Sequence, residues 1–136
     1  MILNAGIRRF NNSAGPELFV DPTFQNAPSW TQGGTKITVT GGALVIAALA
    51  VYNTDYVEQT ISGLFVGAHY RLNIIAASLS GNLFEIDVVG VSTPVSIGAA
   101  GSATGFFTAT ATTHTLRLTA QTAPTGTITS VSFRRI

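Results

Sequence analysis

Glu85 and Asp87 form the carboxylate pair in this sequence that most resembles acid–base machinery. Both lie in the segment 82–89, where they alternate with apolar residues. In an extended strand, this spacing places the two carboxylates on one face, about 6.5–7 Å apart. That separation is near the range found in inverting glycosidases. Two acids on such a face also commonly lie in water or pair with an arginine, here Arg71 or Arg117. We therefore predict no catalytic residue from this pair.

A second group of residues has the chemistry of a sugar site. Tyr52, Asn53 and Tyr56 cluster around Asp55 between two predicted strands, and Trp30 lies in an earlier loop. Aromatic rings pack against pyranose faces, while amides and carboxylates bind hydroxyl groups. The sequence therefore gives Trp30, Tyr52, Asn53 and Tyr56 as candidate glycan-binding residues. The alternatives are a structural tryptophan and an ordinary polar loop with two tyrosines at its rim.

Other reactive constellations are missing from the sequence. Cys is absent, and His69 and His114 have no partner at metal-ligand or catalytic-triad spacing. We therefore expect no catalytic residues, no metal site, no cofactor and no enzymatic activity.

Composition restricts the classes of partner. Only 10% of the 136 residues are charged and the formal net charge is +1, so no broad field attracts nucleic acid or an anionic membrane. The longest apolar run, 43–51, is too short to span a bilayer, and no secretory signal is visible. A surface poor in charge is typical of a chain whose neighbours cover it in an assembly.

Period-2 alternation continues almost to the last residue and predicts an all-β fold. The stretch 56–77 reads as two paired strands joined by a tight glycine turn. The predicted strands are 18–24, 36–40, 43–50, 57–62, 70–78, 82–89, 106–110, 115–120 and 127–135, with a looser glycine-containing stretch at 95–105. Because no amphipathic helix is predicted, the expected architecture is an antiparallel β-sandwich, a jelly roll of eight or nine strands, covering 17–136.

Residues 1–16 stand apart from this pattern. They combine apolar and arginine side chains and end in the breaker cluster 11–16, which predicts an extended N-terminal arm. The residues expected to dock on a partner are Ile2, Leu3, Ile7, Arg8, Arg9 and Phe10. If the termini lie close together, Arg8 and Arg9 would form one basic patch with Arg134 and Arg135.

Several segments together resemble a known family. They are Pro22-Thr23-Phe24, the loop Ser29-Trp30-Thr31, the strand 41–46, the stretch 57–74 (VEQTISGLFVGAHYRLNI) and the closing segment Ser130–Phe133. This order is similar to the jelly roll of carbohydrate-binding modules, in which a Gln precedes a glycine turn and a Tyr opens the next strand, as Gln59 and Tyr70 do here. The resemblance implies that Trp30 plugs one end of the sandwich.

The resemblance also carries two functional implications, and the sequence departs from the family in both. The family often holds a structural calcium with a carboxylate from the last strand, where this sequence has Ser130 and no Asp or Glu follows Asp87. Its glycan-binding members are usually joined to an enzyme by a linker, whereas this sequence starts at Met1 and shows no linker.

Domains of this shape also resemble bacteriophage capsid decoration, fibre and tail accessory proteins. The sequence therefore favours a virion structural protein that binds other virion proteins and itself, with a trimer expected. The alternative is a carbohydrate-binding module for adsorption to a host glycan.

Overall fold

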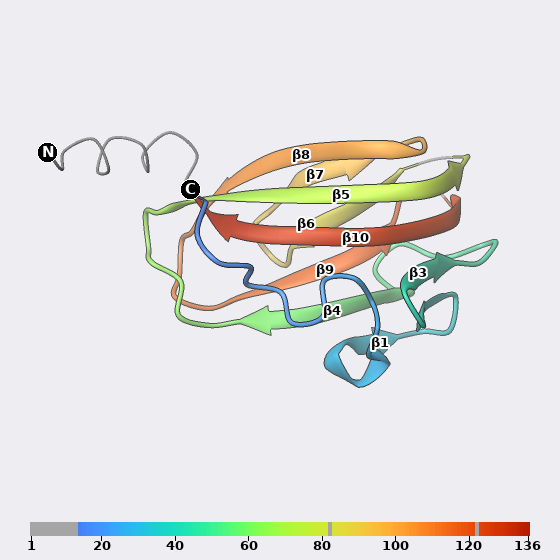
Figure 1. The fold of residues 1–136 in the computed structure, drawn as a ribbon, viewed down its shortest axis with the longest axis horizontal. Coiled ribbons are helices and arrows are strands. Elements are labelled where there is room, and N and C mark those ends of the chain that lie inside the picture. The colour runs from blue at the N-terminus through green and yellow to red at the C-terminus, as the bar shows by residue number, and fades with distance from the viewer. Residues whose placement is uncertain (1–13, 82, 122) are drawn as a thin grey trace, which may run out of the picture.

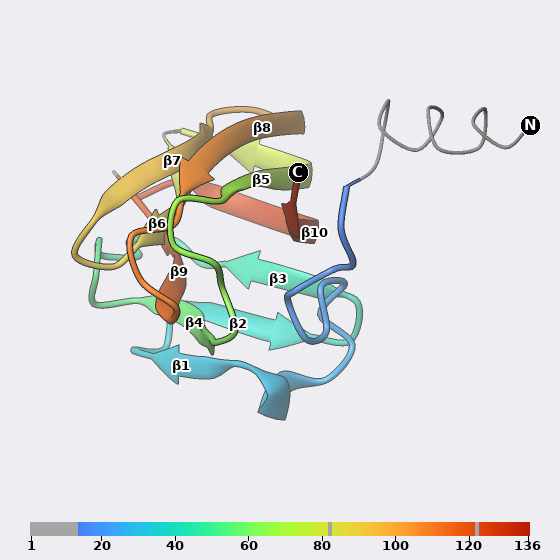
Figure 2. The same ribbon diagram turned by 90° about the vertical axis from the view of Figure 1, so that its left-hand side faces the viewer.

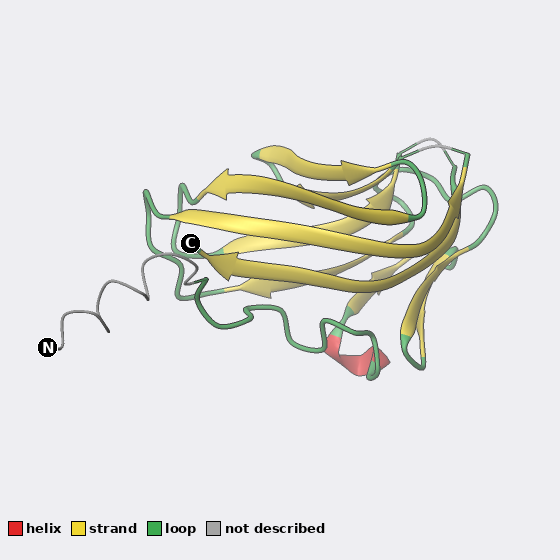
Figure 3. Ribbon diagram, turned by 45° about the horizontal axis from the view of Figure 1, so that its top comes forward, coloured by secondary structure: helices red, strands yellow, loops and turns green. Residues whose placement is uncertain are grey.

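The protein is a sandwich of two antiparallel sheets, as seen in a computed structural model that describes residues 14–81, 83–121 and 123–136. Sheet A has the strand order β1-β4-β9-β6-β7, and sheet B has the order β2-β3-β10-β5-β8 (Figures 1 and 2). Apart from one short 3-10 turn, the described elements are strands (Figure 3). The predicted all-β sandwich is confirmed.

The bounds of the elements follow the predicted alternation closely from residue 36 onward. They are η1 (Ala27–Ser29), β1 (Thr31–Gly33), β2 (Ile37–Thr40), β3 (Ala43–Ile46), β4 (Tyr56–Ile61), β5 (His69–Ser80), β6 (Phe84–Val88), β7 (Ser92–Ile97), β8 (Gly101–Thr108), β9 (His114–Ala120) and β10 (Thr125–Arg135). The loose stretch 95–105 is therefore the end of one strand and most of another, because its glycines do not prevent pairing with β6 and β5.

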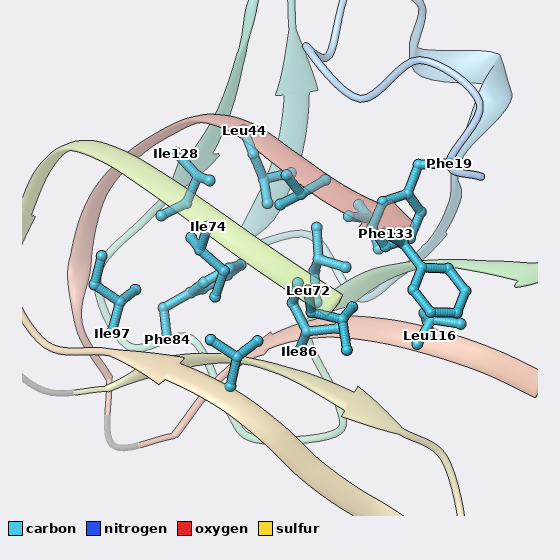
Figure 4. Packing of buried hydrophobic residues seen from close by; sticks show 14 of the residues in the cluster. Phe19, Leu44, Leu72, Ile74, Phe84, Ile86, Ile97, Leu116, Ile128 and Phe133 are labelled. Atoms are coloured by element: carbon cyan, nitrogen blue, oxygen red, sulfur yellow. The ribbon is translucent and has the colours of Figure 1, made fainter. Parts of the chain in front are cut away.

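The core lies between the two sheets and is built from alternate residues of each strand. Leu72 and Ile74 of β5 face Ile86 of β6 and Leu116 of β9, all fully buried (Figure 4). Burial of one such side chain contributes about 1.5–3 kcal/mol, so the shared apolar layer is the main force holding the sheets together.

One predicted pairing is wrong. β4 and β5 were expected to form a hairpin, but β4 pairs with β1 and β9, whereas β5 pairs with β8 and β10. The connection 62–68 crosses from one sheet to the other, with left-handed backbone at Gly63 and Gly67. Alternation shows that each strand buries one face, and it does not show which sheet contains the strand.

The predicted strand 18–24 is also wrong, because this segment is an irregular loop. Asp21 and Phe24 have positive φ angles, which a strand does not accommodate. The loop still buries Phe19 and Phe24 against Trp30, with ring centroids 5.4 and 5.3 Å from the Trp30 ring. The Trp30 indole N–H donates to the carbonyl of Asp21 at 3.2 Å. These aromatic contacts close one side of the sandwich.

The first described residues run beside the last strand. The amide of Gly15 donates to the carbonyl of Arg135 at 2.6 Å, so the chain enters the domain next to its C-terminal end (Figure 1). The predicted docking residues of the arm, Ile2 to Phe10, lie outside the described residues, and the predicted arm remains untested.

Gly105 marks a close approach between the edge strands of the two sheets. A Cβ atom at this position in β8 would collide with the backbone carbonyl of Pro94 in β7. Neither backbone can withdraw without breaking ladder hydrogen bonds to its own sheet.

We therefore expect Gly105→Ala to lower the free energy of unfolding by at least about 2 kcal/mol, as overpacking against backbone does. Gly15→Ala is the matched control, because a Cβ there meets only ordinary contacts. Denaturant unfolding measures both, and equal stability of the two variants would contradict the close approach.

Candidate functional site

The loop between β3 and β4, residues 47–55, lies over the outer face of sheet A and is held there by one carboxylate. Asp55 accepts hydrogen bonds from the backbone N–H groups of Val51 at 2.8 Å and of Thr35 and Lys36 at 3.1 Å. Burial alone would raise the pKa of Asp55, but these hydrogen bonds outweigh it and hold the pKa below its ordinary value. The charged carboxylate thus fixes the loop to the start of β2.

A second set of contacts presses the loop onto the sheet. Asn53 has φ of 60°, a left-handed conformation that Asn tolerates. Its N–H donates to the Thr119 hydroxyl at 3.2 Å, and that hydroxyl donates to the carbonyl of Asp55 at 2.9 Å. Because Thr119 belongs to β9, the side chain of the neighbouring Tyr52 is directed over the middle of sheet A.

Tyr52 reaches a carboxylate of β6. Its hydroxyl donates to Asp87 Oδ2 at 2.8 Å, and the Thr93 hydroxyl of β7 donates to Asp87 Oδ1 at 2.6 Å. The hydrogen bond to Asp87 and burial both raise the pKa of Tyr52. Asp87 therefore joins the loop, β6 and β7.

Glu85 lies beside Asp87 and is only 2% exposed. Burial, together with hydrogen bonding and charge repulsion from Asp87, raises the pKa of Glu85 to about 8. Glu85 is thus protonated at neutral pH. The Thr93 hydroxyl of β7 lies 3.4 Å from Glu85 Oε2 and 2.6 Å from Asp87 Oδ1, so a protein side chain bridges the two carboxyl groups.

The expectation that these two acids lie in water or pair with an arginine is therefore wrong. They do face away from the core, but side chains of the loop and β7 cover them, and neither forms an ion pair with Arg71 or Arg117. Arg117 instead binds Glu58, with Nη2 to Oε1 at 2.7 Å. Alternation correctly located the face, and it could not show that a loop 30 residues earlier in the sequence would cover it.

Arg117 forms the opposite wall of the site. Its guanidinium lies 3.9 Å from the centroid of the Tyr56 ring, and Nη1 donates to the Asn53 side-chain oxygen at 3.4 Å. The salt bridge and ring contact leave this guanidinium in a fixed orientation at the edge of the loop.

These groups surround a pocket of about 190 Å³. Tyr52, Asn53, Asp87 and Arg117 line it together with residues 88–93, the turn between β6 and β7 and the start of β7. Its volume lies below the roughly 300 Å³ typical of sites for drug-sized ligands, so it fits one small polar unit. The lining offers carboxylate and carbonyl acceptors, guanidinium and hydroxyl donors, and one aromatic ring.

The structure separates the four predicted glycan-binding residues. Tyr52 and Asn53 line the pocket. Tyr56 is outside the lining, and its ring packs against the Arg117 guanidinium. Trp30 is buried in the core with Phe19 and Phe24, away from the pocket. Sequence reasoning missed Thr93 and Arg117 as pocket residues, because only the strand register places them beside Asp87.

Two other properties concern the described residues only. Within 14–81, 83–121 and 123–136, no group of three or more His, Asp or Glu residues is arranged to hold a metal ion. No helix in the same ranges is long and apolar enough to cross a membrane.

Comparisons with known proteins identify the fold. No protein-family model matches the sequence, and no curated protein is found as a relative by sequence. Among solved structures, the CBM1 module of BiXyn10A matches with a TM-score of 0.64 at 13% identity, covering 88% of this chain and 99% of that module. The CBM22-1–GH10 portion of xylanase 10B from Clostridium thermocellum, solved with xylohexaose, matches with a TM-score of 0.61 at 15% identity, covering 89% of this chain.

A viral protein shares the fold less closely. The enzymatically active domain of tailspike protein 4 from bacteriophage CBA120 matches with a TM-score of 0.51 at 14% identity, covering 88% of this chain. This chain spans only 29% of the xylanase chain and 21% of the tailspike chain. The likeness shows that the fold is that of carbohydrate-binding modules, which confirms the predicted resemblance.

The buried proton of Glu85 gives a test of the site's electrostatics. The folded protein holds this proton up to about pH 8, whereas the unfolded chain releases it near the ordinary value of 4.5. Because the folded state then binds more protons than the unfolded state, the free energy of unfolding should fall as pH rises from about 5 to about 8.

We expect Glu85→Gln, which keeps the shape and removes the titration, to unfold at a higher temperature than wild type at pH 8.5 and to show a weaker decline between pH 5.5 and 8.5. Calorimetry at both pH values measures this difference. The same decline in both proteins would show that folding does not raise the pKa of Glu85.

Proposed function

We propose that this protein binds glycans through the pocket between the loop 47–55 and the β6–β7 turn. The observation that carries the proposal is the pocket itself, where the exposed ring of Tyr52 adjoins the Asp87 carboxylate and the Arg117 guanidinium. A sugar ring presents an apolar face beside a rim of hydroxyl groups, and this lining complements both.

The chemistry of the lining fits a hydroxyl-rich unit. Asp87 accepts hydrogen bonds from Tyr52 at Oδ2 and from Thr93 at Oδ1, and a carboxylate has about four acceptor sites, so it retains capacity for a ligand hydroxyl. Arg117 is held by Glu58 and Asn53 but carries more N–H groups than these contacts use. The pocket would therefore hold one sugar residue, with further residues extending over the outer face of sheet A.

The fold supports the same function. Both carbohydrate-binding-module structures cover almost the whole of this chain, and the xylanase structure contains xylohexaose. Such likeness at 13–15% identity establishes only the architecture, so the proposed glycan binding rests on the pocket of this chain.

Binding to a panel of neutral oligosaccharides that includes xylohexaose tests the proposal by calorimetric titration. We expect Tyr52→Ala to weaken binding at least about tenfold, because it removes the ring and the contact to Asp87. Tyr52→Phe should weaken binding less, since it keeps the ring.

Phe106→Ala is the matched control for an aromatic side chain, because Phe106 is exposed on sheet B. Trp30→Ala is unsuitable, since it would remove a core ring at a cost of about 3–5 kcal/mol. The proposal fails if no oligosaccharide binds, or if Tyr52→Ala and Phe106→Ala bind equally well.

A second candidate is the virion structural protein favoured by the sequence, located in the particle and assembling with other virion proteins or as a trimer. Its support is the fold shared with the phage tailspike domain and the low charge content. Both functions are compatible in one surface-displayed protein. Mass spectrometry of purified particles should detect this chain at a fixed stoichiometry, and its absence there would leave glycan binding as the function.

A further inference from the structure

The end of the sandwich where β10 stops and β5 begins carries three arginines. On the outer face of sheet B, Arg134 of β10 lies opposite Arg71 of β5, and Arg71 lies opposite Phe106 of β8. Arg135 follows at the end of β10, with its guanidinium 4.5 Å from the centroid of the Phe65 ring. Like charges directly opposite one another in a sheet destabilise it, so an added negative charge would stabilise this end.

The carboxylate nearest to this cluster compensates only one of the three. Glu17 lies 3.5 Å from Nε of Arg134 and also accepts hydrogen bonds from Ser132 and the N–H of Phe133. In the parts of the chain that the structure describes, the ion pairs are Arg117–Glu58 and Arg134–Glu17. Neither includes Arg71 or Arg135.

Exposed apolar side chains lie at the same end of the sandwich. Phe65 is 60% exposed, Val66 64%, Phe106 61% and Ile136 51%. Ile136 lies at this end because its N–H donates to the carbonyl of His69, the first residue of β5. Arginine and aromatic side chains are enriched at the energetic centres of protein–protein interfaces.

The acids of the chain itself are engaged elsewhere in the fold. Each of its six acids already accepts a hydrogen bond within the protein, namely Glu17, Asp21, Asp55, Glu58, Glu85 and Asp87. Residues 1–13 contain Arg8 and Arg9 and no acid. The N-terminal segment therefore supplies no carboxylate side chain, and the acids of a second copy are engaged in contacts of its own fold, so an acidic segment of another protein fits this surface better.

We propose that the Arg–Phe end, formed by Phe65, Val66, Arg71, Phe106, Arg135 and Ile136, docks an acidic segment of another protein. Carboxylates of the partner pair with Arg71 and Arg135, and apolar side chains of the partner pack on Phe65 and Phe106. The pocket on sheet A takes no part in this contact, so the two surfaces work independently.

Selection of a random 12-residue peptide library against the full chain tests the proposal. We expect the enriched peptides to combine Asp or Glu with aromatic or aliphatic residues. In fluorescence anisotropy, their affinity should fall at least about tenfold in Arg71→Gln/Arg135→Gln and in Phe106→Ala. Lys36→Gln is the charge control and should leave the affinity unchanged, because Lys36 is exposed and lies at the other end of the sandwich, beside β2.

Other results would overturn the proposal. These are enriched peptides without acids, failure to enrich any peptide, or binding that survives the double arginine variant. A tenfold gain in peptide affinity on deleting residues 2–13 would identify the N-terminal segment as the resident occupant instead. Oligosaccharide binding should be the same in the double arginine variant and the wild type, so failure of this proposal is distinguishable from failure of the proposed function.

Discussion

The candidate site depends on the three backbone hydrogen bonds that the Asp55 carboxylate accepts. Hydrogen bonds to a charged group contribute about 1.5–3 kcal/mol each, enough to hold an irregular loop in one conformation. With the loop fixed, Tyr52 reaches Asp87 and Asn53 reaches Thr119, and the outer face of sheet A becomes a walled pocket. Without it, the same sheet face would be flat and open to solvent.

Covering that face has an electrostatic consequence. Glu85 loses contact with water and keeps its proton to about pH 8, whereas Asp55 is stabilised in its charged form. The two acids change the stability of the folded state in opposite directions as pH varies. The contribution of Asp55 is present above its unfolded pKa and is lost as pH falls through its lowered folded value, while Glu85 disfavours the folded state as pH rises toward 8.

Much of the fold was predictable from the sequence because burial of one strand face produces alternation in the residues themselves. The segments from Ile37 to Arg135 show this pattern, and most of their strands were located within a few residues. The loop 18–24 was misjudged because its apolar residues pack on Trp30 through positive φ angles, which leave no periodic signal. Tyr52 and Asn53 were identified from side-chain chemistry, but Arg117 and Thr93 join them only through the order of strands in sheet A.

The pocket of sheet A is the proposed glycan-binding site. Titration of the ¹⁵N-labelled protein with neutral oligosaccharides, followed by two-dimensional NMR, would locate the contact residue by residue. We predict shifts concentrated at Tyr52, Asn53, residues 88–93 and Arg117, with sheet B unaffected. Shifts confined to sheet B or to the Arg–Phe end, or none at millimolar ligand, would contradict it.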